Sequence, residues 1–155
     1  MGCELVITIK LAGREELSEL LAIRREMLSV VNGVPESGIS DEIMRLSEEY
    51  FLNGEQTTVL AYCDGRLAGC ATACWVTVMP TYSHPTGKRA HIMNVYTRSE
   101  FRRMGVARLM MEQLLAQARL RGATSITLDA TKDGRPLYEA LGFIGSDESM
   151  ELAIR

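Results

Sequence analysis

The chain has 155 residues, the usual size of one domain, which leaves room for one substantial hydrophobic core. Its 46% hydrophobic and 24% charged residues are typical of a globular protein and exclude disorder as the main state. The net charge of -3 argues against a nucleic-acid-binding surface, and no apolar run reaches the roughly 20 residues of a membrane-spanning helix. We therefore expect a single domain over residues 1–155 in the cytoplasm, without nucleic-acid or membrane partners.

The N-terminal third of the chain predicts one strand and two helices. Residues 4–10 alternate in polarity as a strand does, and a helix with one apolar stripe follows from Gly13. Ser40 is placed to cap a second helix, which ends at Asn53-Gly54. Arg24 sits within the apolar stripe of the first helix. Its guanidinium either reaches solvent over an apolar stem or faces a carboxylate or phosphate in a cleft, and both interpretations stay open.

The middle of the chain predicts three more strands. Runs rich in strand-forming residues cover 57–63 and 67–79, and the Asp64-Gly65 pair between them is a strong hairpin signal. A loop over residues 80–88 leads to a further strand over 89–97. This part of the chain predicts a largely antiparallel meander.

The last third of the chain alternates between helices and strands. It predicts a long helix over 106–121 with Gly122 as its C-cap, a strand over 125–130, a short helix over 133–141, and final strands over 143–154. The strands on either side of the long helix form a parallel βαβ unit. Together the elements predict a mixed α/β fold with a mostly antiparallel sheet and flanking helices.

The cysteines do not form a metal-binding pattern. None of Cys3, Cys63, Cys70 and Cys74 belongs to a C-x-x-C pair, and only two histidines accompany them. Cys70 and Cys74 lie on one face of a predicted strand about 13 Å apart, too far for a disulfide. We expect reduced cysteines and no metal.

The segment from 92 to 107 carries the strongest local signal. A strand leads through a loop to Arg102, Arg103 and Gly105, and a helix begins there without a capping side chain. Such a helix start offers free backbone N–H groups, and the glycine lets a ligand approach the backbone closely. With Arg108 nearby, the segment suits an anion that carries several phosphates. Neither the P-loop nor the dinucleotide-binding spacing is present.

Two motifs in this order resemble those of the GNAT N-acetyltransferase superfamily. Residues 102–107, Arg-Arg-Met-Gly-Val-Ala, resemble the acetyl-CoA motif R/Q-x-x-G-x-G/A, and residues 134–143 resemble the L-Y-x-x-x-G-F signature. The spacing between the motifs accommodates one helix and one strand. The resemblance implies a six- to seven-stranded sheet with a splayed parallel pair in the centre. It also implies transfer of an acetyl group from acetyl-CoA to a primary amine by direct attack.

The resemblance further implies which residues hold acetyl-CoA. Main-chain groups of the splayed strand would bind the pantetheine arm, and backbone N–H groups at the start of the long helix would bind the pyrophosphate. Thr131 stands where many family members have an asparagine that contacts pantetheine. The expected cofactor-binding residues are Val95, Tyr96, Thr97, Arg102, Arg103, Met104, Gly105, Val106, Ala107, Arg108 and Thr131.

Direct attack of an amine on a thioester expels a thiolate, for which Tyr138 is the candidate proton donor. A phenol that titrates near pH ~10 can protonate a thiolate whose conjugate acid titrates near ~8.5. The alternative for Tyr138 is a core aromatic. His91 is the candidate base, with a structural histidine as its alternative. Asn94, on the other strand face, either orients the acceptor or thioester carbonyl or only bonds backbone.

The resemblance places the acceptor pocket among the first two helices and the loop before the fourth strand, here residues 24–53 and 80–88. The expected substrate-binding residues are Arg24, Asn94 and Tyr82. A small-molecule amine, amino acid or antibiotic fits the charge balance, a protein N-terminus or lysine is the alternative, and the family makes a homodimer plausible. Acidic residues in these stretches could attract a cationic amine: Glu36, Asp41, Glu42, Glu48 and Glu49. A different class of function on the same fold is a non-catalytic acyl-CoA-binding sensor or interaction module.

Overall fold

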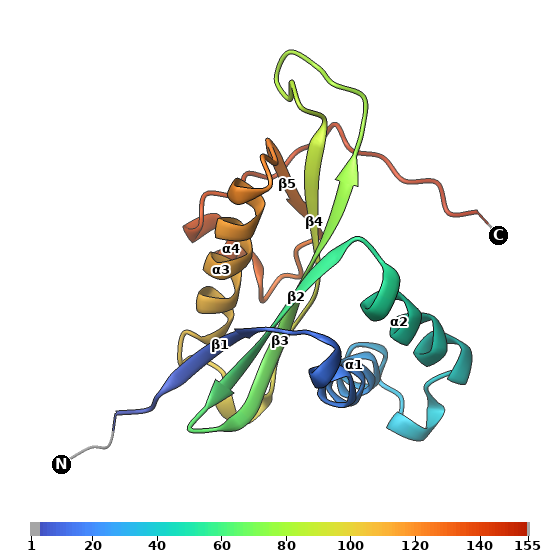
Figure 1. The fold of residues 1–155 in the computed structure, drawn as a ribbon, viewed down its shortest axis with the longest axis vertical. Helices are drawn as coiled ribbons and strands as arrows, with labels where there is room; N and C mark the ends of the chain where they lie inside the picture. Colours follow the sequence, from blue (N-terminus) through green and yellow to red (C-terminus); the bar gives the residue numbers. More distant parts are fainter. Residues whose placement is uncertain (1–3, 155) are drawn as a thin grey trace.

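A computed structural model of the chain describes residues 4–154, in which one five-stranded sheet carries helices on both faces (Figure 1). Cys3, expected to be a reduced thiol, lies outside the described residues. The strands are β1 (Ile7–Leu11), β2 (Gln56–Cys63), β3 (Arg66–Thr77), β4 (Lys88–Thr97) and β5 (Ser125–Leu128). The α-helices are α1 (Leu17–Asn32), α2 (Asp41–Asn53), α3 (Val106–Leu120) and α4 (Arg135–Ala140). Up to α4, this order confirms the predicted order of elements.

The strands lie side by side in their chain order. Neighbouring strands from β1 to β4 pair antiparallel, and β4 pairs parallel with β5. The turn between β2 and β3 has Asp64 at φ 48° and Gly65 at φ 79°, so both residues occupy the left-handed region that a tight hairpin turn needs. Ser40 caps α2 as predicted, because its Oγ accepts a hydrogen bond of 3.4 Å from the N–H of Ile43.

The prediction of final strands in the C-terminal stretch of the chain was wrong. Within the described residues the sheet has five strands rather than six or seven, and residues 143–154 form none of them. The parallel pair therefore lies at an edge of the sheet rather than in its centre. A strand needs a neighbouring strand for its backbone hydrogen bonds, and alternating polarity in the sequence does not supply one. The large apolar side chains of this stretch are strongly exposed: Ile144, Met150, Leu152 and Ile154.

The sheet separates two apolar layers. Alternation along β2 turns Val59 and Ala61 toward α3 and turns Leu60 toward α1. On the α3 side the fully buried Met110 and Leu114 pack against the sheet, and each such side chain contributes roughly 1.5–3 kcal/mol by leaving water. Figure 1 shows α1 and α2 on one face and α3 and α4 on the other. No helix among residues 4–154 is long and apolar enough to cross a membrane.

Candidate active site

The edge of β4 loses its neighbour half-way along the strand. β4 and β5 pair from Arg89 opposite Ser125 to Ile92 opposite Leu128, and β5 ends there. β4 continues to Thr97, so its last five residues have no strand on that side. This geometry agrees with the predicted splay, and it leaves backbone groups of Val95, Tyr96 and Thr97 free of sheet partners on the β5 side.

A β-bulge lies at the point where the two strands part. Asn94 and Val95 of β4 oppose the single residue Ala71 of β3, and Asn94 has φ 58°. Asparagine tolerates this left-handed conformation better than most residues. Both polar atoms of its side-chain amide form hydrogen bonds, since Oδ1 accepts from Nη1 of Arg24 at 3.0 Å and Nδ2 donates to Oγ1 of Thr72 at 3.4 Å. The bulge therefore points the side-chain amide of Asn94 toward Arg24 on α1 and fixes its orientation.

The loop before α3 presents free backbone donors. Between Arg103 and Arg108 no backbone N–H donates to another described residue, and the first that does is that of Leu109, to the carbonyl of Gly105 at 3.1 Å. Arg103 has φ 63° and Gly105 has φ 83°, a pairing that turns successive N–H groups into one concavity. A Cβ on Gly105 would meet nothing within 4 Å, so the space beside it is open. The loop has the geometry of an anion-binding site.

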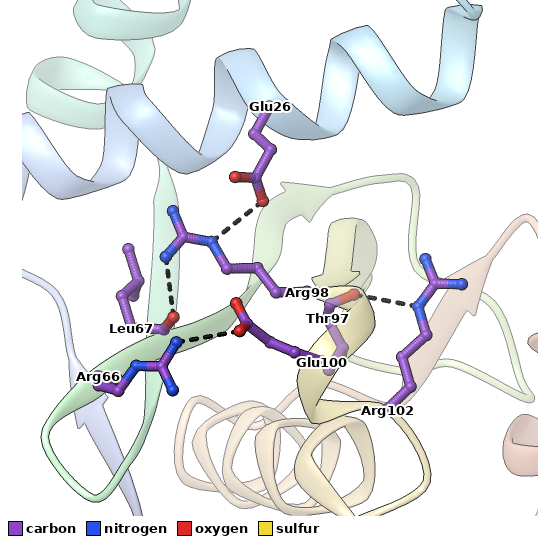
Figure 2. A network of polar contacts seen from close by, with 7 residues as sticks. All are labelled: Glu26, Arg66, Leu67, Thr97, Arg98, Glu100 and Arg102. Atoms are coloured by element: carbon purple, nitrogen blue, oxygen red, sulfur yellow. Dashed lines mark hydrogen bonds and ion pairs between the residues drawn. The ribbon is translucent and has the colours of Figure 1, made fainter.

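The arginines near this loop are bound in different ways. Nε of Arg102 donates to the carbonyl of Thr97 at 3.2 Å, which holds its side chain against the end of β4 (Figure 2). Arg108 forms an ion pair of 3.0 Å with Glu112 one turn along α3. Met104 lies exposed between them. Two of the predicted phosphate-binding side chains thus already have partners, whereas the backbone donors do not.

Arg98, which no sequence pattern indicates, joins the end of β4 to α1 and to the start of β3. Its Nε donates to Oε2 of Glu26 on α1 at 3.1 Å, and its Nη1 donates to the carbonyl of Leu67 at 3.0 Å. Figure 2 shows the guanidinium reaching from the strand end up to α1. Because Arg98 and Glu26 are 72 positions apart, no local pattern could have revealed the pair. Burial and the neighbouring Glu26 carboxylate also raise the pKa of Tyr96 to about 12.

Tyr138 lies on α4, packed against the α3 side of the sheet. Only 9% of it is exposed, and its ring meets that of Phe143 edge to face at 5.9 Å between centroids. Its hydroxyl makes no hydrogen bond to the described residues. Burial raises the pKa of Tyr138 above its ordinary value, which keeps the phenol protonated. Thr131, on the loop before α4, accepts a hydrogen bond from the Gly134 N–H at 3.1 Å and so holds the start of this helix.

His91 stands on the opposite face of the sheet from Tyr138. Its neighbour Ile92 packs toward α3, so the imidazole faces the other way. Nδ1 lies 2.7 Å from Oγ1 of Thr127 on β5, and Nε2 lies 3.9 Å from a carboxylate oxygen of Asp129. No local pattern in the sequence indicates these two partners, which can orient the imidazole ring.

An apolar pocket of about 290 Å³ lies between α1, α2 and the strands β3 and β4. Of the predicted substrate-binding residues, Arg24 and Asn94 line this pocket and Tyr82 does not. Tyr82 is fully exposed on the β3–β4 loop. The pocket is completed by Ile43, Leu46, Ser47, Tyr50, Phe51, Thr72, Cys74 and Met93.

The acidic residues that were expected to attract an amine stay outside the pocket lining. Neither Glu36, Asp41 nor any of the three glutamates of α2 is among the lining residues. Glu42 and Glu49 instead contact Arg45 on the surface of α2, at 2.7 and 3.7 Å. Among residues 4–154, no three His, Cys, Asp or Glu side chains gather closely enough to hold a metal ion.

Comparison with known proteins agrees with this geometry. The sequence model of the acetyltransferase (GNAT) family matches residues 21–143, well over half of the chain. The chain belongs to the GNAT family. Over 96% of both chains, its structure superposes on that of a predicted acetyltransferase with acetyl-CoA from Clostridium acetobutylicum, at 30% identity and a TM-score of 0.82. The two sequence motifs and the fold thus point to the same acetyltransferase family.

Two further proteins that are similar to this chain are named for the amines that they acetylate. A thialysine N-epsilon-acetyltransferase of Caenorhabditis elegans is 32% identical over 71 residues, a match that spans 44% of this chain and 44% of that protein. The aminoglycoside N-acetyltransferase AAC(6')-Iy, in complex with CoA, superposes with a TM-score of 0.77 over 100% of this chain and 99% of its own, at 16% identity. The second likeness shows the shared GNAT fold alone.

Proposed function

We propose that this GNAT protein transfers the acetyl group of acetyl-CoA to the primary amine of a small molecule by direct attack. The observation that carries the proposal is the unpaired end of β4, which leads through a short loop into a helix start with free backbone N–H groups. The relative with acetyl-CoA and the two relatives named for amine acceptors support the same chemistry. The proposal treats residues 1–155 as a single cytoplasmic domain.

In this proposal the cofactor lies along the free edge of β4. The main chain of Val95, Tyr96 and Thr97 binds the pantetheine arm, and the N–H groups from Arg103 to Arg108 bind the pyrophosphate. Gly105 provides the open space that the phosphates need. Thr131, on the loop between β5 and α4, is also proposed to contact the arm.

The chemical step forms a C–N bond and breaks a C–S bond. The neutral amine attacks the thioester carbonyl, the tetrahedral intermediate collapses, and the CoA thiolate takes a proton from the Tyr138 phenol. The amine nitrogen loses its surplus proton to His91, directly or through water. Because His91 and Tyr138 lie on opposite faces of the sheet, the base and the acid would act from the two sides of the β4–β5 splay.

We also propose that a second copy of the chain covers the outer edge of β5. This edge has no strand beside it in the described residues, and Met150, Leu152 and Ile154 alternate with other residues in an extended, exposed stretch. The free edge of β5 offers unpaired backbone N–H and C=O groups, and the C-terminal stretch has the alternating apolar pattern of a strand that lacks a neighbour, so the two can pair. Exchange of this stretch between two copies would bury both.

The direct test is thermal melting with acetyl-CoA and with CoA, followed by thiol release across a panel of amines, amino acids, aminoglycosides and short peptides. Preferential binding to the folded state raises the melting temperature by mass action. We expect a shift with both coenzymes and release of thiol that depends on the acceptor. A shift without turnover would favour a non-catalytic acyl-CoA-binding sensor instead, and no shift would contradict acetyl-CoA as the donor.

A further inference from the structure

The pocket beside the β-bulge has a charge that an amine acceptor alone does not explain. Its walls are mostly apolar, with Ile43, Leu46, Phe51 and Met93 among them. Arg24 is the cation that lines it, and none of its lining residues is a carboxylate. An ammonium group entering this pocket would therefore meet a like charge and no counter-charge.

Neutral partners hold the Arg24 guanidinium in place. Nη1 donates to Oδ1 of Asn94 at 3.0 Å, and Nε lies 3.5 Å from Oγ of Ser47 on α2. Neither partner carries a charge, so these contacts orient the guanidinium without neutralising it. Nη2 donates to no other residue within 4–154, which leaves one side of the guanidinium fork available.

Arg24 also lacks an ion pair among the described residues, in contrast to Arg98, which pairs with Glu26. Burial lowers the pKa of Arg24, and the ionisable groups close enough to affect it are the thiols of Cys70 and Cys74. A half-buried cation without a counter-ion is costly to a protein. Such a cation is typical of a site in which the ligand supplies the negative charge.

We propose that the acceptor is a small amino carboxylic acid, whose carboxylate binds the free side of the Arg24 guanidinium and whose apolar carbon skeleton fills the pocket. The inference rests on the proposed function, because it specifies the acceptor of that same reaction. A planar carboxylate matches the paired donors of one guanidinium. A phosphate group would call for further positive charge, and the pocket lining holds no second cation.

The size of the pocket limits the acceptor. A volume of about 290 Å³ lies at the small end of the range of ligand sites. An amino acid with an aliphatic or aromatic side chain fits this space. The several ammonium groups of a polycationic aminoglycoside would instead meet the Arg24 guanidinium without any carboxylate in the pocket lining. The inference thus separates this chain's acceptor from that of the structurally similar aminoglycoside enzyme.

Matched acceptors test the role of the carboxylate. Thiol release is measured at saturating acetyl-CoA with leucine, leucinamide and isoamylamine, and with 6-aminohexanoate, 6-aminohexanamide and hexylamine. We expect that for leucine or for 6-aminohexanoate, whichever is the better acceptor, kcat/KM is at least tenfold higher than for the matching amide and the matching amine. Arg24→Gln should abolish this preference and Arg24→Lys should keep part of it. The matched control is Arg25→Gln, because Arg25 does not line the pocket and its side chain hydrogen-bonds the exposed carbonyl of Glu36, so this variant should keep the preference.

A second measurement tests carboxylate binding at Arg24 without depending on the acetyl-transfer reaction. Hexanoate, which has the carboxylate and the apolar chain but no amine, should raise the melting temperature of the wild-type protein and of Arg25→Gln, but not that of Arg24→Gln. Equal use of acids and amides, or a preference that Arg24→Gln leaves unchanged, would overturn the inference. Absence of turnover with every amine would count against the proposed function, whereas the hexanoate result would still decide for or against a carboxylate site at Arg24.

Discussion

Tyr138 is the single side chain on which the proposed protonation of the thiolate depends. Tyr138→Phe keeps the ring that packs on Phe143 and removes only the hydroxyl, so we expect kcat to fall about 100-fold while KM for acetyl-CoA changes little. Steady-state thiol release measures both constants. Tyr62→Phe is the matched control, since its hydroxyl bonds Glu19 away from the splay, and it should keep the wild-type kcat. A Tyr138→Phe enzyme within twofold of wild type would rule out the acid role.

The same residue sets an expectation for the pH profile. An acid must be protonated to act, and burial raises the pKa of Tyr138 from its ordinary value. The phenol therefore keeps its proton throughout the range below pH ~10, and any loss of kcat from its ionisation should appear only above that value. A basic limb with a midpoint well below pH ~10 that persists in Tyr138→Phe must come from another group.

Gly105 is the residue whose backbone conformation the phosphate loop needs. Gly105→Ala forces an alanine into φ 83°, which costs about 1–2 kcal/mol, and also places a methyl group in the open space beside the loop. Gly33→Ala carries a similar backbone cost at φ 63°, at the end of α1 and away from the loop. Calorimetric titration should show at least tenfold weaker CoA binding for Gly105→Ala and unchanged binding for Gly33→Ala. Equal affinities in the two variants would place the phosphates elsewhere.

At the scale of elements, the pair of Arg98 and Glu26 joins α1 to the end of β4. Both side chains are less than one third exposed, so Arg98→Met leaves a carboxylate without its partner and should cost about 2 kcal/mol of unfolding free energy. A double-mutant cycle with Glu26→Gln should give a coupling of about 1 kcal/mol by urea denaturation. Arg66→Met, which breaks the more exposed pair with Glu100, should cost less than about 0.5 kcal/mol. If Arg98→Met and Arg66→Met cost the same free energy of unfolding, the pair of Arg98 and Glu26 does not stabilise the fold more than a surface ion pair does.

At the scale of the whole molecule, the C-terminal stretch and the outer edge of β5 should meet in a dimer. Leu152→Glu combined with Ile154→Glu places charges on the exposed apolar side of that stretch, and we expect a dimer of the wild type to become a monomer. Sedimentation equilibrium over a range of concentrations measures the change. Val31→Glu near the end of α1 is another exposed apolar position, on a helix that Figure 1 shows far from β5, and serves as the control. A wild-type protein that is monomeric at every concentration would refute the exchange.

Features encoded by short-range patterns were accessible from the sequence. The hairpin at Asp64-Gly65, the cap at Ser40 and the helix start after Gly105 depend on conformational preferences of one or two residues, and the structure has all three. The order of elements up to α4 follows from hydrophobic periods of a few residues. The family motifs lie in the same part of the chain, over 102–107 and 134–143.

Features that join distant residues came from the tertiary structure. Arg24 meets Asn94 across 70 positions, His91 meets Thr127 across 36, and no spacing in the sequence encodes either contact. The final strands were mispredicted for the same reason, because an apolar alternation becomes a strand only where a neighbouring strand can receive its hydrogen bonds. The charge of the pocket also depends on which side chains α1 and α2 turn inward. Local preferences act within one turn or one hairpin, whereas pairing and enclosure depend on how the whole chain packs.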